Sequence, residues 1–321
     1  MSGAFEHPAT IGISVFLVAL LAVAPVIFEV LNRMGKLTRE LRRELYARYF
    51  SWLVLVPLML VPVLAGRLFT IFAVGLLGLF AYREFARATG FFRNRLLSAA
   101  VVLGIVLITL ASADHWYGFF MALSSLTVCA LVIVALIGDQ PKGYLQRVAL
   151  AVFAFALFGV CLGHFGYFAN DKNYRPLLLL ILLCVELNDV FAFCCGKFFG
   201  RRKLAPNTSP GKTWGGAIGA FVLTTALFAG IGWFVFAGTV LAAPVHLVTM
   251  GALLSFTGQL GDLVISSVKR DLGVKDMGVV IPGHGGLLDR FDSLLFVGPA
   301  LFHYIGYFVG VGLHQPARLW F

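Results

Sequence analysis

The sequence predicts an all-α, polytopic transmembrane protein of about ten spanning helices, with a candidate active site in the cytoplasmic loops and helix ends of its C-terminal half. Hydrophobic residues make up 60% of the 321 residues, and the mean hydropathy is +0.92. Apolar runs near or above about 18 residues recur along the chain, which is the length that a helix needs to cross a bilayer. The charged residues, 12% of the chain, gather in short segments between these runs.

The apolar runs give ten expected spans, at residues 10–32, 50–66, 68–82, 97–113, 117–138, 148–169, 176–196, 214–236, 244–266 and 291–312. The first run is too long for the core of a signal peptide and no basic residue precedes it, so we expect it to stay as a transmembrane helix. The second and third runs are short enough to form a re-entrant pair. We divide the chain into an N-terminal membrane region, 1–170, and a C-terminal catalytic membrane region, 171–321.

The distribution of Lys and Arg predicts the orientation. With the N-terminus outside, the loops 33–48, 83–95, 142–147, 197–212 and 269–290 are cytoplasmic and hold 6, 4, 2, 5 and 4 of these residues, whereas the other side holds only four. Cytoplasmic loops carry such an excess of cations in membrane proteins. Within 33–48, cations alternate with leucines at helical spacing, which predicts an interfacial amphipathic helix against anionic headgroups. We interpret Arg83, Glu84 and Arg87 as boundary residues whose charges reach the interface.

The net charge of +10 does not indicate a nucleic-acid partner. Its cations lie in short loops between apolar runs, so they are typical of topology signals and contacts with anionic membrane lipids, and no nucleic acid is expected. The five cysteines, Cys129, Cys161, Cys184, Cys194 and Cys195, all lie within apolar runs without metal-ligand spacing. We interpret them as small core residues.

Residues 262–292 carry nine charged side chains, a density that sets this segment apart from the rest of the chain. If the preceding helix continues into it, Asp262, Ser266 and Lys269 recur at i, i+4 and i+7 and share one face. Ionisable groups at the membrane boundary are functional by default, so we favour a reaction centre over a solvated loop that happens to be charged.

A second pair of carboxylates, Asp289 and Asp292 with Arg290 between them, begins the last apolar run. The cationic side chains between the two carboxylate-bearing helix ends are Lys269, Arg270, Lys275, Arg290 and, when protonated, His284. Carboxylates place and neutralise Mg²⁺, cations hold phosphate oxygens, and glycines let the backbone come close. The segment therefore predicts a site for a divalent metal together with a polyphosphate.

Glu186 and Asp189 lie at i, i+3 within an otherwise apolar helix. A charge at the centre of a membrane helix costs about 2.5–3.5 kcal/mol on insertion scales, so something cationic or aqueous is expected beside them. The metal site, a lysine, or protonation of Glu186 would each satisfy this requirement.

The run NTSPGKTW, residues 207–214, suggests a nucleotide loop. A Walker loop would need glycine where Pro206 stands, and no parallel-sheet pattern precedes it, so we reject that motif. Ser209, Lys212 and Thr213 can still hold phosphates through hydroxyl, ammonium and exposed N–H groups, at the start of the following helix.

Both charged segments resemble the phosphatidate cytidylyltransferase (CDP-diacylglycerol synthase) family. The signature residues are Ser266, Lys269, Arg270, Lys275, Asp276, Gly278, Ile281, Pro282, His284, Gly285, Gly286, Leu287, Asp289, Arg290 and Asp292. An Asn-Asp pair, Asn188 and Asp189, and an S-P-x-K-T-W run extend the resemblance, with Gly215 where the family pattern usually has glutamate. The resemblance covers about 185–292, and the first 170 residues match only in being hydrophobic.

The resemblance implies transfer of CMP from CTP to phosphatidic acid, with release of pyrophosphate. The distribution of Lys and Arg separately predicts that both charged segments lie on the cytoplasmic side, where a nucleoside triphosphate is available, and we expect a bacterial inner membrane. Mg²⁺ is the expected cofactor, with a second cation left open, and a homodimer is one expected assembly. Asp262 and Asp289 are the expected metal ligands, supported by Asp189 or Asp292. The expected phosphate-holding and catalytic residues are Lys269, Arg270, Lys275, Asp276, His284 and Arg290, and the expected substrate-binding residues are Asn188, Lys203, Ser209, Lys212, Thr213 and Ser266.

Two alternatives remain open from the sequence. The same metal site could act on another phosphorylated membrane lipid, such as a polyprenyl or ether-linked phosphate. Ten spans and two carboxylates within the membrane would also suit a transporter. The concentration of charge in two cytoplasmic loops, instead of at a midplane site between repeats, favours the enzyme.

Overall fold

A computed structural model describes residues 5–35, 38–278 and 285–310. Its elements are α1 (Pro8–Arg33), α2 (Arg39–Ala65), α3 (Arg67–Ala88), η1 (Phe91–Arg93), α4 (Arg95–Ala113), α5 (Tyr117–Val134), α6 (Tyr144–Ala154), the π-helical η2 (Phe155–Cys161), α7 (Leu162–Phe168), α8 (Tyr174–Phe199), β1 (Lys203–Ala205), β2 (Ser209–Thr213), α9 (Trp214–Val235), η3 (Val240–Ala242), α10 (Pro244–Asp271), α11 (Leu288–Phe291) and α12 (Leu294–Val309).

The all-α polytopic class is confirmed. Within the described residues, nine helices are long and apolar enough to cross a membrane, with α6, η2 and α7 forming one of them, Tyr144–Phe168. The tenth expected span, 291–312, corresponds to α12, which has 16 residues. A helix of that length is shorter than the roughly 20 residues that span a bilayer, and Asp289 and Arg290 before it belong to the separate short helix α11.

Two expectations for the N-terminal half are wrong. The basic stretch within 33–48 does not form a separate interfacial helix over its length, because α2 begins at Arg39 and runs without interruption for 27 residues. Arg, Leu and Glu are strong helix formers, so the helix continues through the interface. The candidate spans Leu45–Ala65 and Arg67–Ala88 have 21 and 22 residues, so α2 and α3 are two long helices and not a re-entrant pair.

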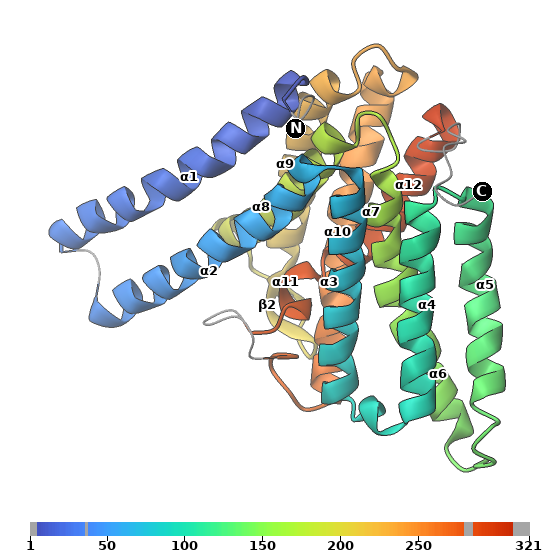
Figure 1. The fold of residues 1–321 in the computed structure, drawn as a ribbon. Coiled ribbons are helices and arrows are strands. Elements are labelled where there is room, and N and C mark those ends of the chain that lie inside the picture. Colours follow the sequence, from blue (N-terminus) through green and yellow to red (C-terminus); the bar gives the residue numbers. More distant parts are fainter. Residues whose placement is uncertain (1–4, 36–37, 279–284, 311–321) are drawn as a thin grey trace.

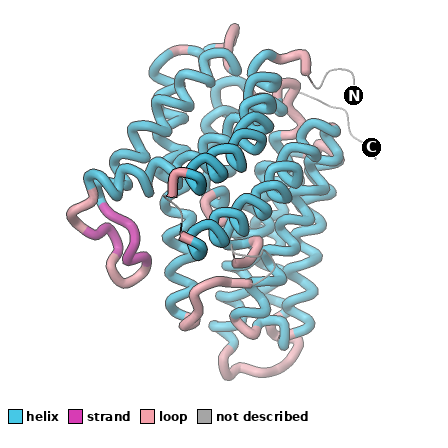
Figure 2. Tube along the Cα trace, turned by 90° about the vertical axis from the view of Figure 1, so that its left-hand side faces the viewer, coloured by secondary structure: helices cyan, strands magenta, loops and turns pink. Residues whose placement is uncertain are grey.

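The segment expected as a loop at 197–212 contains a β-hairpin. Strands β1 and β2 pair antiparallel, with Lys203 opposite Thr213 and Ala205 opposite Ser209. Pro206, which ends β1, begins the turn, because proline fixes φ at a value suited to turns and lacks an N–H for pairing. Figure 2 shows this hairpin projecting from the side of the helix bundle, at the left of the view.

The helices form an upright bundle with a tilted pair beside it. In Figure 1, α1 and α2 run diagonally next to the upright helices α3, α4 and α10. Helix α8 packs along α9, α9 packs along α10, and α10 packs along α12. The surface of α1 is largely exposed and apolar, as expected for a helix that faces lipid.

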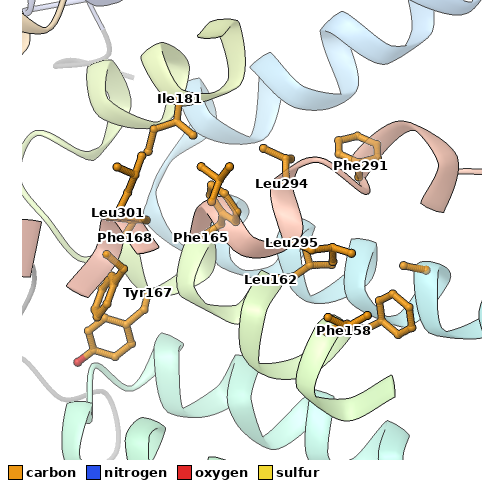
Figure 3. Packing of buried hydrophobic residues seen from close by; sticks show 14 of the residues in the cluster. Phe158, Leu162, Phe165, Tyr167, Phe168, Ile181, Phe291, Leu294, Leu295 and Leu301 are labelled. Carbon is orange, nitrogen blue, oxygen red and sulfur yellow. The ribbon is translucent and has the colours of Figure 1, made fainter. Parts of the chain in front are cut away.

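A buried core fixes the C-terminal elements that carry the charged signature. Figure 3 shows Phe165 and Phe168 of α7 near Leu294 and Leu301 of α12, with Ile181 of α8 close by. These side chains are at most 5% exposed. The short helix α11 also contacts α3. The start of α12, and with it the signature, is therefore held against both halves of the chain.

Candidate active site

Asp289 organises the signature segment by accepting hydrogen bonds on both carboxylate oxygens. Its Oδ1 accepts from Lys269 Nζ at 2.9 Å, and its Oδ2 accepts from the backbone N–H groups of Met277 and Gly286, each at 2.9 Å. Only 2% of the Asp289 side chain and 11% of the Lys269 side chain are exposed. Asp289 thus joins the start of α11 to Lys269 at the end of α10, and also to Met277 and Gly286.

Glu84 of α3 is a second organising carboxylate, and its predicted role as a boundary residue is wrong. Its Oε1 accepts from the N–H of Leu287 at 2.9 Å, and its Oε2 accepts from the N–H of Leu288 at 2.8 Å. These N–H groups are at the start of α11, where backbone donors have no partner within the helix. Glu84 is buried, so it does not reach the interface, whereas its neighbours Arg83 and Arg87 are exposed.

The two carboxylates explain three glycines of the signature. A Cβ on Gly278 would lie 2.7 Å from Glu84 Oε1, and one on Gly286 would lie 2.5 Å from Glu84 Oε2. Gly285 has φ +80°, and a Cβ there would lie 2.9 Å from Asp289 Oδ2. Side chains at these positions would displace the carboxylates from the N–H groups that they bind.

The hairpin and the signature segment meet in the fold. Lys212 on β2 forms an ion pair with Oδ2 of Asp262 on α10. Arg270, near the end of α10, donates from Nε to the carbonyl oxygen of Thr208 in the hairpin turn at 3.1 Å. Ser266 donates to Asp262 Oδ1 at 3.2 Å, one turn along the helix. The two segments, about 60 residues apart in sequence, therefore form one charged region.

Three carboxylates from three elements lie within electrostatic range of one another. Asp189 of α8 and Asp262 of α10 both act on Asp292, which lies between α11 and α12. Burial raises the pKa of Asp292 well above its usual range, the carboxylates of Asp262 and Asp189 raise it further, and Lys269 lowers it. A Cβ on Gly261 would lie 2.4 Å from the carbonyl oxygen of Asp292, so this glycine lets α10 come close.

The expected cationic partner of the membrane carboxylates is present. Arg290 lies within electrostatic range of both Glu186 and Asp189, and Lys212 lies within range of Asp189. The Arg290 Nε is buried without a hydrogen-bond partner among the described residues. Cations from the signature and the hairpin therefore lie near the carboxylates of α8.

The donor chemistry of this region fits a hard divalent cation. Asp189, Asp262 and Asp292 offer carboxylate oxygens, the ligands that Mg²⁺ prefers. Their mutual repulsion and the raised pKa of Asp292 would both be relieved by a bound cation. Among the described residues, however, no three acidic, His or Cys side chains already converge as metal ligands, so binding would require side-chain reorientation.

Two predicted substrate-binding residues have structural partners. Asn188 is 1% exposed, and its Oδ1 accepts from Thr224 Oγ1 of α9 at 3.0 Å and from Ser255 Oγ of α10 at 2.6 Å. Thr213 caps α9 by accepting from the N–H of Gly216 at 3.1 Å. These contacts join the hairpin and three helices, and a contact of either residue with substrate stays a prediction.

The remaining predicted residues are distributed around the same region. Lys203 is exposed at the start of β1, Ser209 is half-buried at the start of β2, and Lys275 and Asp276 are exposed after α10. The prediction for His284 lies outside the described residues. The structure therefore brings the hairpin, the end of α10 and α11 together, and leaves the roles of these five side chains as predictions.

Gly215 stands where the resembled pattern usually has glutamate, and the packing accounts for its small size. A Cβ at this position would lie 2.5 Å from the carbonyl oxygen of Phe199 at the end of α8. Contacts below about 3 Å between a Cβ and backbone atoms force the backbone to shift. In this chain the start of α9 therefore packs directly on α8, and no side chain fits between them.

The fold and site define an integral membrane protein with a charged site at one end of its helix bundle. The sequence profile of the cytidylyltransferase family matches residues 46–308, so the chain belongs to this family. The match includes α3, and it covers most of both halves of the chain. Family membership supports the enzyme over the transporter that the sequence left open.

Curated relatives agree with this assignment. The chain is 31% identical over 296 residues to the uncharacterized protein YnbB of Escherichia coli K12, covering 91% of this chain and 96% of that protein. It is 32% identical over 257 residues to the phosphatidate cytidylyltransferase of Bacillus subtilis 168, covering 77% and 92% of the two chains. The phosphatidate cytidylyltransferase of Mycobacterium leprae is 38% identical over 165 residues, half of each chain.

Proposed function

We propose that the chain transfers CMP from CTP to phosphatidic acid, giving CDP-diacylglycerol and pyrophosphate for phospholipid biosynthesis. The Bacillus subtilis relative, matched over most of both chains, carries the corresponding name. The observation that carries the proposal is the meeting of the hairpin with α10, which places Lys212 of the hairpin beside Asp262 and the hairpin turn beside Arg270 of the signature. Cations from two segments are needed because a triphosphate and an anionic lipid bring several negative charges into one place.

In this reaction an oxygen of the lipid phosphate bonds to the α-phosphorus of CTP, and the bond to the bridging oxygen of the pyrophosphate breaks. The nucleophile is already an anion, so no general base is required, and positioning and charge neutralisation carry the catalysis. Lys212, Arg270 and Lys269 would hold phosphate oxygens. Asp289 and Glu84 would hold the signature backbone in place.

We include Mg²⁺ in the proposal, with Asp189, Asp262 and Asp292 as the residues that would hold it. A bound divalent cation would neutralise developing charge on the phosphoryl oxygens. Asp262 is paired with Lys212, so loading would exchange this partner for the metal and leave the ammonium for the nucleotide. The ligand role predicted for Asp289 would compete with three existing hydrogen bonds.

The proposed orientation puts the N-terminus outside and the site at the cytoplasmic face of the bacterial inner membrane. The excess of Lys and Arg in the loops at this end of the bundle supports it. A nucleoside triphosphate is available on the cytoplasmic side. A second cation and a homodimer are further parts of the proposal that activity and mass measurements can address.

The test uses purified protein in lipid nanodiscs with CTP, MgCl₂ and phosphatidic acid. CTP labelled at the α-phosphate should yield labelled lipid, and CTP labelled at the γ-phosphate should yield labelled pyrophosphate. Parallel reactions with polyprenyl phosphate identify the lipid. Label transfer only to polyprenyl phosphate would refute the proposed substrate, and pyrophosphate release without any lipid product would refute the transfer.

A double-mutant cycle tests whether both segments act in one site. Lys212→Ala and Lys269→Ala should each lower kcat/KM for CTP. Their double variant should show a coupling energy of about 0.5–3 kcal/mol, the range for residues that share a network. Additive effects, or normal kinetics of Lys212→Ala, would mean that the hairpin is only a connector.

A further inference from the structure

A cavity of about 580 Å³ lies beside the signature, between α2, α3, α7 and α8. Its wall is apolar along most of its length and includes residues from the signature itself, Met277, Gly278 and Leu287. Three charged residues line it, Arg83, Glu84 and Arg87, all near the end of α3. The cavity is therefore apolar along the helix and charged at the end that adjoins the candidate active site.

The cavity is long enough for a lipid chain. Its lining residues on α3 run from Thr70 to Arg87, and at 1.5 Å per residue this corresponds to about 25 Å along the helix axis. One leaflet of a bilayer contributes roughly 15 Å of hydrocarbon thickness. Along its apolar part the wall is formed by side chains such as Ala73, Leu77 and Phe80. An acyl chain that lies parallel to α3 would contact apolar atoms over its length.

The charge at the end of the cavity is positive. Arg83 and Arg87 are exposed, lie one turn apart on the same face of α3, and form no ion pair with another described residue. The carboxylate of Glu84 directs its two oxygens to the N–H groups of Leu287 and Leu288, and its single negative charge is outnumbered by the two guanidinium groups. Two guanidinium groups remain for an anion.

A neighbouring cavity makes a useful comparison. It has a volume of about 330 Å³, lies between α1, α2 and α8, and shares Met59 and Leu182 with the first cavity. Its charged lining residue is Glu186, an acid, so it offers no attraction to a phosphate. Of these two apolar cavities, the one along α3 combines an apolar wall, a direct border with the signature, and cations that pair with no residue in the part of the chain that the structure describes.

We propose that the cavity along α3 seats an acyl chain of the lipid substrate, and that Arg83 and Arg87 hold its phosphate beside the signature. The inference rests on the proposed function and adds where and how the lipid is recognised. A phosphate monoester carries about −1.5 to −2 charges near neutral pH, whereas the diester of an ordinary phospholipid carries one, so two arginines select for the monoester. The arginines are substrate-binding residues, and the cavity sets which chains are accepted.

The kinetic test uses the double variant Arg83→Gln with Arg87→Gln in nanodiscs. The KM for phosphatidic acid should rise by about 10- to 100-fold, from the loss of charge-assisted hydrogen bonds, with the KM for CTP unchanged. Arg93→Gln is the matched control, since this exposed arginine follows α3 and does not line the cavity. A wild-type KM for the lipid in the double variant would overturn the proposal.

A binding test separates this inference from the proposed function. Phosphatidic acid with a photoreactive group in its acyl chain should label peptides of α3 between Thr70 and Phe80, whether or not the protein turns over. Excess phosphatidic acid should abolish the labelling, whereas phosphatidylglycerol should not. Equal competition by both lipids would mean that the cavity holds bulk membrane lipid and would refute recognition of the monoester. Absent catalysis with selective labelling would refute the proposed reaction alone.

A cavity-filling variant tests the seat of the chain independently of the arginines. Ala73→Phe places a ring in the middle of the apolar wall, so activity with long-chain phosphatidic acid should fall several-fold more than activity with a short-chain form. Equal loss for both chain lengths would contradict the proposed seat. Normal labelling of α3 by the long-chain probe in this variant would contradict it as well.

Discussion

Glu84→Gln is the substitution that most directly tests how the N-terminal half supports the site. The carboxylate of Glu84 accepts one backbone N–H on each oxygen, from Leu287 and Leu288, at the start of α11. Glutamine has the same shape but offers one acceptor and one NH₂ group. One of the two N–H groups would therefore face a donor in a buried position.

The magnitude follows from the number of hydrogen bonds. A bond from an N–H to a charged acceptor contributes about 1.5–3 kcal/mol, a neutral one contributes about 0.5–1.5 kcal/mol, and a buried donor left unpaired costs about 1–3 kcal/mol. The substitution should therefore destabilise this conformation of the signature by about 2–4 kcal/mol. If the substrates bind only this conformation, kcat/KM falls by about 30- to 1000-fold.

The assay is CMP transfer in nanodiscs, with monodispersity and thermal unfolding measured on the same preparation. Glu29→Gln is the matched control, because the side chain of Glu29 is 43% exposed and its ion pair with Arg33 is also exposed, so the pair should contribute little. Full activity of Glu84→Gln would refute the role of Glu84. If Glu84→Gln aggregates, Glu84→Asp takes its place in the test. The shorter carboxylate of aspartate should reach only one N–H, so the loss of kcat/KM should be smaller.

Three further predictions concern the signature, the packing of α9 and the orientation. Asp289→Asn should abolish transfer, because it leaves the buried Lys269 ammonium without its charged partner, at a cost of about 3–5 kcal/mol. Retained turnover at saturating Mg²⁺ would exclude both this structural role of Asp289 and a role as metal ligand. Gly215→Ala should lower the free energy of unfolding by about 1–3 kcal/mol, because the added Cβ clashes with the end of α8. Gly230→Ala in the same helix should not, because its added Cβ meets no atom within 4 Å, and equal effects of the two substitutions would contradict the packing. In a variant without native cysteines, a cysteine at Asn207 should be labelled only from the cytoplasm and one at Asn173 only from outside, and labelling of both from one side would refute the orientation.

The parts of the fold that the sequence predicted are those set by hydrophobic length. The long apolar runs match the helices of the bundle, because a membrane span needs about 20 apolar residues and leaves a strong local pattern. The predictions that are wrong concern segments whose composition suits two different structures equally well. Residues 39–44 are as suitable for the first turns of α2 as for a separate interfacial helix, and only the contacts of the whole helix decide.

The site was predicted where chemistry and spacing coincide, and missed where a contact is long-range. The spacing of Asp262 and Ser266 correctly predicted that they share one helix face, where Ser266 donates a hydrogen bond to Asp262. Glu84 was missed because its partners lie more than 200 residues away and are backbone N–H groups, which leave no mark in the sequence. The sequence signal that could have indicated this contact is Gly278 and Gly286, since a glycine often stands where another group approaches the backbone closely.

The acidic residues of this region divide into two groups according to their hydrogen-bond donors. Glu84 and Asp289 have both oxygens occupied, mostly by backbone N–H groups, so their charges are satisfied by the chain itself and serve to hold the signature. Asp189, Asp262 and Asp292 instead lie within range of one another, with Lys212, Lys269 and Arg290 nearby. Charges that repel one another in a buried region are stable only if protons or cations compensate them. The hydrogen-bond needs of the first group are therefore met before any substrate binds. The second group keeps an affinity for added positive charge, which is the condition for the site that we propose for a metal and a triphosphate.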